Sequence, residues 1–313
     1  MLASCPADVV LAHGGSAALV TALAVPRGTV RVWQRILGFP SWKPLQRQLW
    51  QAVSSRFDGM VVLTDEMEDE VRALGFRGPV WHVPNARDPE RFMSIDRPTA
   101  SAELREILGV GPDASVLGFV GHLVPQKQAE LAVEVLADLR HRGIDAHLVI
   151  AGDGPDRPEV EARAVTCGVE GSVTLLGHRD DPELVFGGAD VALITSRSEG
   201  IPGVAIEAQM AGCPVVTFLV GGVEDVVEDH VTGLIVPWPE PLLMAKMVAG
   251  LLEDRGRLGA MSEAAIARAD TFSVARSGAM YAEVLDVLYR TTGATAPAGG
   301  IAADRLEPTT TVR

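Results

Sequence analysis

Cysteine is scarce in this 313-residue sequence, and positive charge is outnumbered by negative charge. The three cysteines, Cys5, Cys167 and Cys213, form no Cys-x-x-Cys pair and share no metal-ligand spacing, which argues against a zinc motif or a disulfide framework. We therefore expect reduced thiols and a cytoplasmic protein. Lysine and arginine total 27 against 41 aspartate and glutamate, and this net charge of −14 disfavours a nucleic-acid partner.

The sequence also lacks an uninterrupted apolar segment long enough to be a convincing membrane span. One uncharged run, residues 9–26, approaches the length of a spanning helix. It contains His13-Gly14-Gly15-Ser16, however, which divides it into a Val-rich strand, a glycine turn and an Ala-rich helix. We expect this segment to belong to a water-soluble domain.

Short apolar runs alternate with helical patterns along most of the chain, which predicts an α/β fold with parallel sheets covered on both faces. The predicted strands are residues 9–12, 30–33, 60–63, 80–83, 116–120, 147–151, 173–176, 191–194, 215–218 and 234–236. We expect two Rossmann-like, doubly wound domains, at residues 1–97 and 98–272. The first has four strands against six in the second, so it is predicted to be incomplete. A helix over 273–290, packing back toward the first domain, and a disordered tail over 291–313 complete the predicted organisation.

Residues 27–57 are basic and contain Trp33, Trp42 and Trp50. Tryptophan interleaved with arginine and lysine is compatible with a peripheral contact to the inner membrane surface or with a lipid-linked or polyanionic acceptor. The alternative, which we favour, is that these tryptophans pack or line a cleft while the charges are solvated.

The most informative segment follows the predicted strand at 191–194. Glu199 precedes a turn formed by Gly200, Ile201, Pro202 and Gly203, and Glu207 lies about one turn inside the following helix. Backbone N–H groups at a helix start favour a phosphate, and carboxylates accept paired hydrogen bonds from vicinal sugar hydroxyls. One acid would hold a ribose and the other a hexose, with a diphosphate between them. The simpler interpretation is that Glu199 is only a turn residue and Glu207 only a solvated helix position. The apolar neighbours of Glu207 argue against a solvated helix face there.

Several further motifs give the sequence a specific resemblance. Over residues 6–289 it is similar to the retaining GT-B glycosyltransferases of family 4, the glycosyl transferases group 1. The signature of a Glu, seven residues and a second Glu is matched by Glu199 and Glu207. The other matches are Val83-Pro84-Asn85, Asp88-Pro89-Glu90-Arg91-Phe92, Gly121-His122-Leu123 with Lys127, Ala151-Gly152-Asp153-Gly154-Pro155, Gly221-Gly222 with Glu224, and Thr232-Gly233-Leu234-Ile235-Val236-Pro237.

The resemblance implies roles for particular residues. Glu207 would hold the donor ribose, Glu199 would orient the hexose, and Lys127 with the backbone of Gly121 and of 200–203 would hold the diphosphate. The family has an arginine where this chain has His122, which weakens charge compensation at an anion whose charge grows in the transition state. His13 matches a position near the acceptor cleft, although a lone histidine after an apolar strand is commonly structural.

Other departures concern the acceptor side. The cleft histidine expected after the next strand has no counterpart, Ala86 replaces a glycine, and the Gly-rich front end that the family carries is not found.

Two functions follow as hypotheses. The first is transfer of a hexose, with retention of configuration, from a UDP- or GDP-sugar to an unknown glycan, lipid-linked or small-molecule acceptor. Glu199, Lys127 and His13 would be the catalytic residues. The reaction is expected to be independent of metal, and no Asp-x-Asp motif is present. The second is a donor-binding remnant or partner subunit that associates with itself or another chain through its incomplete sheet. A GT-B epimerase is a weaker third candidate. The location is predicted to be cytoplasmic, including the inner membrane surface.

Overall fold

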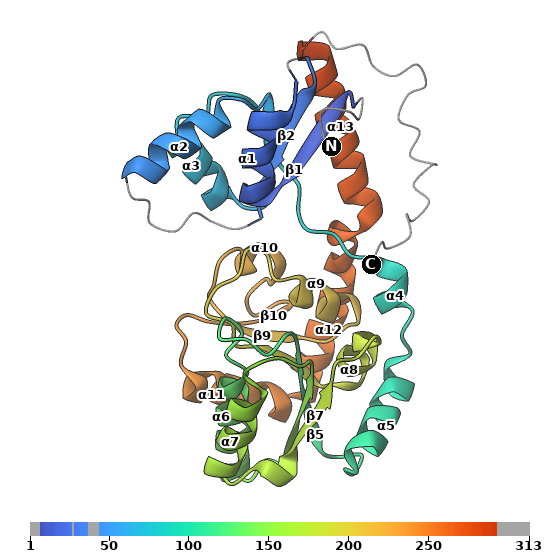
Figure 1. Cartoon of the computed structure of the whole chain (residues 1–313). Helices are drawn as coiled ribbons and strands as arrows, with labels where there is room; N and C mark the ends of the chain where they lie inside the picture. Colours follow the sequence, from blue (N-terminus) through green and yellow to red (C-terminus); the bar gives the residue numbers. More distant parts are fainter. Residues whose placement is uncertain (1–6, 27, 37–43, 293–313) are drawn as a thin grey trace. The chain divides into compact units, whose positions relative to one another are not determined.

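The computed structural model describes residues 7–26, 28–36 and 44–292, and these form two compact units (Figure 1). The first unit contains the described residues up to Asn85 together with those from Val274 onward. The second unit runs from Ala86 to Ser273. Trp42, Arg27 and nearly all of the predicted tail lie outside the described residues.

The first unit is built on a four-stranded parallel sheet in the order β1-β2-β3-β4. Its strands are β1 (Val9–His13), β2 (Val30–Gln34), β3 (Gly59–Val62) and β4 (Val80–His82). Its helices are α1 (Gly14–Ala24), α2 (Pro44–Ser54), α3 (Asp65–Ala73) and α13 (Val274–Thr292). Val284 and Leu288 of α13 pack with Val30, Val32 and Val61 of the sheet in one apolar cluster. A side chain at Gly59 would overlap Trp81, so glycine is required for this close packing.

The second unit contains a six-stranded parallel sheet in the order β10-β9-β8-β5-β6-β7. Its strands are β5 (Ser115–Val120), β6 (Ala146–Ala151), β7 (Val173–Gly177), β8 (Val191–Ile194), β9 (Val215–Phe218) and β10 (Gly233–Val236). Its helices are α4 (Pro89–Met93), α5 (Arg97–Leu108), α6 (Ala129–His141), α7 (Arg157–Thr166), α8 (Pro182–Gly188), α9 (Gly203–Met210), α10 (Val223–Val226), α11 (Pro241–Glu253) and α12 (Arg255–Ala269). The α/β class with parallel sheets is confirmed, and all ten predicted strands are present.

Helices cover both faces of the larger sheet, as continuous apolar strands require. Helix α6 packs against α7 and α11 on one side, and α8 packs against α5 and α9 on the other, where α9 also contacts α12 (Figure 1). The core between the sheet and the first group includes Leu136, Ile150, Val216 and Val248.

The units divide after Asn85, whereas the sequence analysis divides the domains after residue 97. The intervening residues pack with the second unit: α4 contacts α8 and α9, and the Phe92 and Phe186 ring centroids lie 6.4 Å apart. The helix predicted over 273–290 is α13, which packs on the sheet of the first unit and includes Thr291 and Thr292, two residues assigned to the predicted tail.

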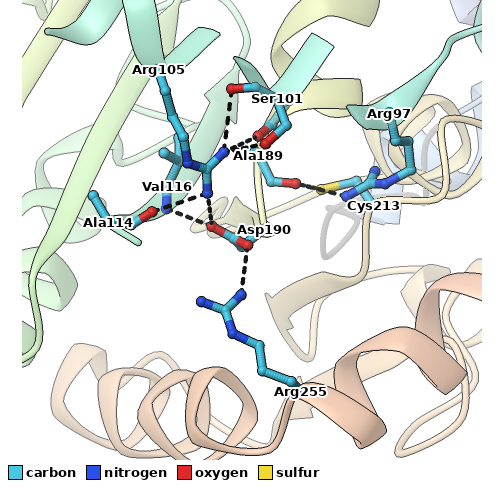
Figure 2. Close-up of polar contacts among 10 residues, drawn as sticks. Arg97, Ser101, Arg105, Ala114, Val116, Ala189, Asp190, Cys213 and Arg255 are labelled. Carbon is cyan, nitrogen blue, oxygen red and sulfur yellow. Dashed lines mark hydrogen bonds and ion pairs between the residues drawn. The ribbon is translucent and has the colours of Figure 1, made fainter. Parts of the chain in front are cut away.

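A buried polar network ties together the N-terminal ends of β5 and β8 (Figure 2). Asp190 accepts hydrogen bonds from the Arg105 guanidinium at 2.8 Å, from the Val116 backbone N–H at 2.8 Å and from Arg255 at 2.9 Å. Arg105 also donates to the Ala114 and Gly188 carbonyls. The network therefore fixes the edge of the sheet opposite to the carboxyl ends of the strands.

Cys213 lies beside this network, and its thiol contacts the Ala189 carbonyl oxygen (Figure 2). Burial raises the pKa of the Cys213 thiol to about 11, so little reactive thiolate exists at pH 8. We expect iodoacetamide to alkylate Cys213 at least about tenfold more slowly than the partly exposed Cys167 in the folded protein, as measured by peptide mass spectrometry. Similar rates for both thiols in urea would be the control, and similar rates without urea would contradict the prediction.

Candidate functional site

The carboxyl ends of β5 and β8 form the point where the strand order reverses in the larger sheet. The chain leaves β5 toward β6 on one side, while β8 pairs with β5 on the other. Loops that follow the two strands diverge at such a position, and open α/β sheets bind ligands in the crevice between them. The segments 121–128 and 195–203 therefore occupy the expected place of a binding site.

Hydrogen bonds hold these two segments together. The Arg197 N–H donates to the Gln126 carbonyl at 3.0 Å, and the Gln126 side chain donates to the Ser198 carbonyl at 2.7 Å. The buried Thr195 hydroxyl donates to the carbonyls of Lys127 and Gln128 at 3.0 and 2.8 Å. The loop carrying Lys127 is thus fixed to the loop carrying Glu199 before any ligand binds.

Lys127 and Glu199 meet across the crevice. Lys127 Nζ lies 2.6 Å from Glu199 Oε1, and the Glu199 side chain is only 10% exposed. Both are predicted donor-site residues, and the structure brings them together from positions 72 residues apart. A mostly buried carboxylate with a lysine partner is not the solvated turn residue of the simpler interpretation.

Glu207 is held by a different cation. It lies on α9, its side chain is 15% exposed, and Arg87 Nε donates to Glu207 Oε1 at 2.5 Å. The guanidinium of Arg87 also covers Gly203, the first residue of α9, because a side chain there would overlap Arg87 Nη2. Arg87 was not predicted as a site residue; its only signal in the sequence is a single arginine between Asn85-Ala86 and Asp88 in an otherwise matched motif.

The turn between the two acids is fixed by its backbone. The Gly222 N–H donates to the Gly200 carbonyl at 2.7 Å, while Ile201 and Pro202 are buried. Gly221 adopts a left-handed φ of +47°, and a Cβ at this position would overlap the Glu199 carbonyl. The glycine pair after β9 is therefore required for the loop to approach Glu199.

A cavity of about 560 Å³ opens at the ends of β5, β6 and β7. Its lining includes Gly121, His122, Asp153, His178 and Arg179. Hydrogen bonds to the Asp181 carboxylate, 2.6 and 2.8 Å long, orient the Arg179 guanidinium and raise its pKa. His178 and Arg179 were not predicted as site residues, although they directly follow a predicted strand. The volume lies within the range of small-ligand pockets.

Gly152 and Gly154 shape the wall of this cavity. A Cβ on Gly152 would overlap the Gly121 carbonyl, and one on Gly154 would overlap the Leu123 carbonyl. The Gly-Asp-Gly motif thus allows the loops after β5 and β6 to touch through their backbones.

His13 lies in the first unit, whereas the predicted donor residues all lie in the second. It is exposed at the end of β1, and its Nδ1 is 2.9 Å from Gln34 Oε1. Trp33 is 1% exposed and stacks on Trp50 with ring centroids 5.3 Å apart, which agrees with the packing alternative for these two tryptophans. The solvated charges of that alternative are wrong for Arg31 and Arg35, whose guanidinium groups are buried and hydrogen-bonded.

The described part of the chain contains neither a cluster of metal ligands nor a membrane-spanning helix. Within residues 7–26, 28–36 and 44–292, no three His, Cys, Asp or Glu side chains gather as metal ligands. The same residues include no helix with the length and apolar character needed to cross a membrane.

Comparison with known proteins identifies the family. The family model described as glycosyl transferases group 1 matches residues 100–268, more than half of the chain and most of the second unit. The chain belongs to the group 1 glycosyl transferases. The family resemblance drawn from the sequence motifs is therefore confirmed.

Curated relatives of this glycosyltransferase-family chain are transferases by name. It is 33% identical over 200 residues to alpha-D-kanosaminyltransferase of Streptomyces kanamyceticus, covering 62% of this chain and 51% of that protein. It is 32% identical over 279 residues to D-inositol 3-phosphate glycosyltransferase of Nocardia farcinica, covering 85% and 60%. The chain thus spans roughly half to three-fifths of the length of these relatives.

Solved structures agree on the fold. HepE from Anabaena in complex with UDP matches with a TM-score of 0.80 at 22% identity, covering 90% of this chain and 79% of that one. Sucrose-phosphate synthase from Thermosynechococcus elongatus matches with a TM-score of 0.79 at 19% identity, covering 91% and 74%. These similarities confirm the GT-B fold class.

Proposed function

We propose that this chain transfers a sugar from a nucleoside-diphosphate sugar to an acceptor hydroxyl, with retention of configuration and without a metal ion. The observation that carries this proposal is the pairing of Lys127 with Glu199, and of Arg87 with Glu207 beside the start of α9, at the crevice of a GT-B donor unit. A pair of acids flanking a helix start and a lysine suits a donor with two sugars joined by a diphosphate.

The donor would bind along this crevice. Its diphosphate would lie at the start of α9. There it would replace Glu199 as the hydrogen-bond acceptor of Lys127 Nζ. Glu207 would accept hydrogen bonds from the ribose hydroxyls, and Glu199 from the hexose. The nucleobase would occupy the cavity that His122, Asp153 and Arg179 help to line. HepE was crystallised with UDP, so UDP is the first nucleotide to test.

Transfer with retention follows from attack on the face that the diphosphate leaves. The bond between the anomeric carbon and the phosphate oxygen breaks, and the acceptor oxygen forms a new bond to the same face of an oxocarbenium-like sugar. The acceptor proton passes to the departing phosphate. Lys127 and the backbone N–H groups at the start of α9 would stabilise the charge that grows on that phosphate.

The donor assignment predicts that Glu207→Gln weakens UDP binding. The amide loses the charge of the carboxylate and one of its acceptor atoms for the ribose diol, and hydrogen bonds to charged groups contribute about 1.5–3 kcal/mol. We expect an affinity roughly 10- to 100-fold lower by isothermal titration calorimetry.

The matched control for this variant is Glu263→Gln, because Glu263 is an exposed glutamate on α12 of the same unit. It should bind UDP like the unmodified protein. Equal UDP affinity in Glu207→Gln and the control would remove the ribose role, and a chain that binds neither UDP nor GDP would remove the donor assignment.

A second candidate function is a donor-binding partner subunit without transfer activity of its own. His122 in place of the family arginine favours it. Such a protein binds UDP but neither transfers the sugar nor hydrolyses a UDP-sugar when alone. A product assay by mass spectrometry, together with sedimentation at several protein concentrations, distinguishes it from an autonomous enzyme.

A further inference from the structure

Arg87 is a cation at the donor crevice that is not among the residues the family resemblance assigns. We propose that Arg87 supplies the second positive charge of the donor-diphosphate site, in place of the arginine that the family has at the position of His122. This inference rests on the proposed function and names a donor-binding residue for it.

The position of Arg87 is fixed by its backbone and its side chain. Its N–H donates to the Phe272 carbonyl at 2.9 Å, and Arg87 forms a parallel bridge with Ser273. In the side chain, Nε donates to Glu207 and Nη1 donates to the Ala86 carbonyl at 2.9 Å. Nη2 lies over Gly203 at the first turn of α9. The guanidinium therefore reaches both the proposed ribose carboxylate and the proposed phosphate position.

The charges of the crevice show why a second cation is needed. Glu199 and Glu207 bring two negative charges close to the place of the donor, and Lys127 balances only one of them. Arg87 balances the other. Without it, a diphosphate carrying negative charge would approach a site with excess negative charge of its own, because His122 lacks the guanidinium that the family has at this position.

Arginine also suits this task geometrically. Its planar guanidinium presents several N–H donors at once, so it can hold a carboxylate and a phosphate oxygen simultaneously. In Arg87 the Nε edge faces Glu207, while Nη2 faces the helix start that favours an anion. We therefore expect donor binding to add a phosphate contact to Arg87 rather than to expel the side chain.

Two ligands separate this role from a merely structural one. UDP contains the phosphates, and uridine contains the same base and ribose without them. We expect Arg87→Met to lower UDP affinity at least tenfold by calorimetry, while uridine affinity, measured by NMR titration, changes less than about twofold. Arg87→Gln still donates an N–H toward Glu207 but lacks the charge, and it should show the same selective loss. Arg87→Lys should retain more UDP affinity than either variant.

The matched control is Arg140→Met, because Arg140 lies on α6 of the same unit and pairs with Asp145 at the N-terminal end of β6, away from the crevice. It should bind both ligands normally, and circular dichroism should show folded protein for every variant.

Equal losses for UDP and uridine would mean that Arg87 acts only through Glu207, and higher affinity for both would mean that it blocks the site; either result overturns the proposal. Unchanged UDP affinity in Arg87→Met would overturn the role of Arg87 but leave the proposed donor binding by this chain standing. Absence of UDP and GDP binding by the unmodified chain would overturn the proposed function as well.

Discussion

Lys127→Ala is expected to lower the turnover number for sugar transfer by about 100- to 1,000-fold, the usual effect of removing one group that stabilises transition-state charge. Lys127 Nζ lies 2.6 Å from Glu199 and would face the departing diphosphate. Its removal has two consequences: the leaving group loses its nearest cation, and the mostly buried Glu199 carboxylate loses the lysine that pairs with it. Both raise the energy of the transition state.

The measurement is steady-state kinetics with a UDP-sugar, or the hydrolysis rate of the UDP-sugar where no acceptor is known. Lys246→Ala is the matched control, since Lys246 is an exposed lysine on α11 of the same unit. The turnover number of the control should stay within about twofold of the unmodified protein. A Lys127→Ala turnover number within threefold of normal would refute the leaving-group role.

The strands and the Glu199–Lys127 pair could be anticipated from sequence for a physical reason. Each strand of a doubly wound sheet is buried on both faces, so it appears as a continuous apolar run between helices. Residues that directly follow such strands gather at one edge of the sheet. Glu199 after β8 and Lys127 after β5 follow neighbouring strands, and the strand order brings them together.

The Arg87–Glu207 pair could not be anticipated in this way. Arg87 is 120 residues from Glu207 and follows β4, which belongs to the other sheet, so strand order does not link the two. The boundary between the units after Asn85 could not be predicted from the sequence either. The apolar pattern alone does not reveal that α4 packs on α8 and α9, because Phe92 could serve either domain until its contact with Phe186 is known.

Asp190→Ala is expected to destabilise the second unit by about 3–5 kcal/mol, as is typical when one partner of a buried ion pair is removed. Asp190 is 13% exposed and accepts hydrogen bonds from Arg105, Arg255 and the Val116 N–H (Figure 2). Its loss leaves the largely buried Arg105 guanidinium without a carboxylate and the Val116 N–H of β5 without its acceptor. Urea unfolding followed by circular dichroism measures the change.

Two further variants assign the loss to the buried pair. Arg255→Ala removes only the exposed arm of the network, so it should cost less than about 1 kcal/mol. Combining Asp190→Ala with Arg105→Leu removes both buried charges, and the double variant should be more stable than the sum of the single effects indicates. Because the network lies at the N-terminal edge of the sheet, UDP affinity of folded Asp190→Ala should match that of the unmodified protein. A stability loss below 1 kcal/mol in Asp190→Ala would show that the network does not hold β5 and β8 together.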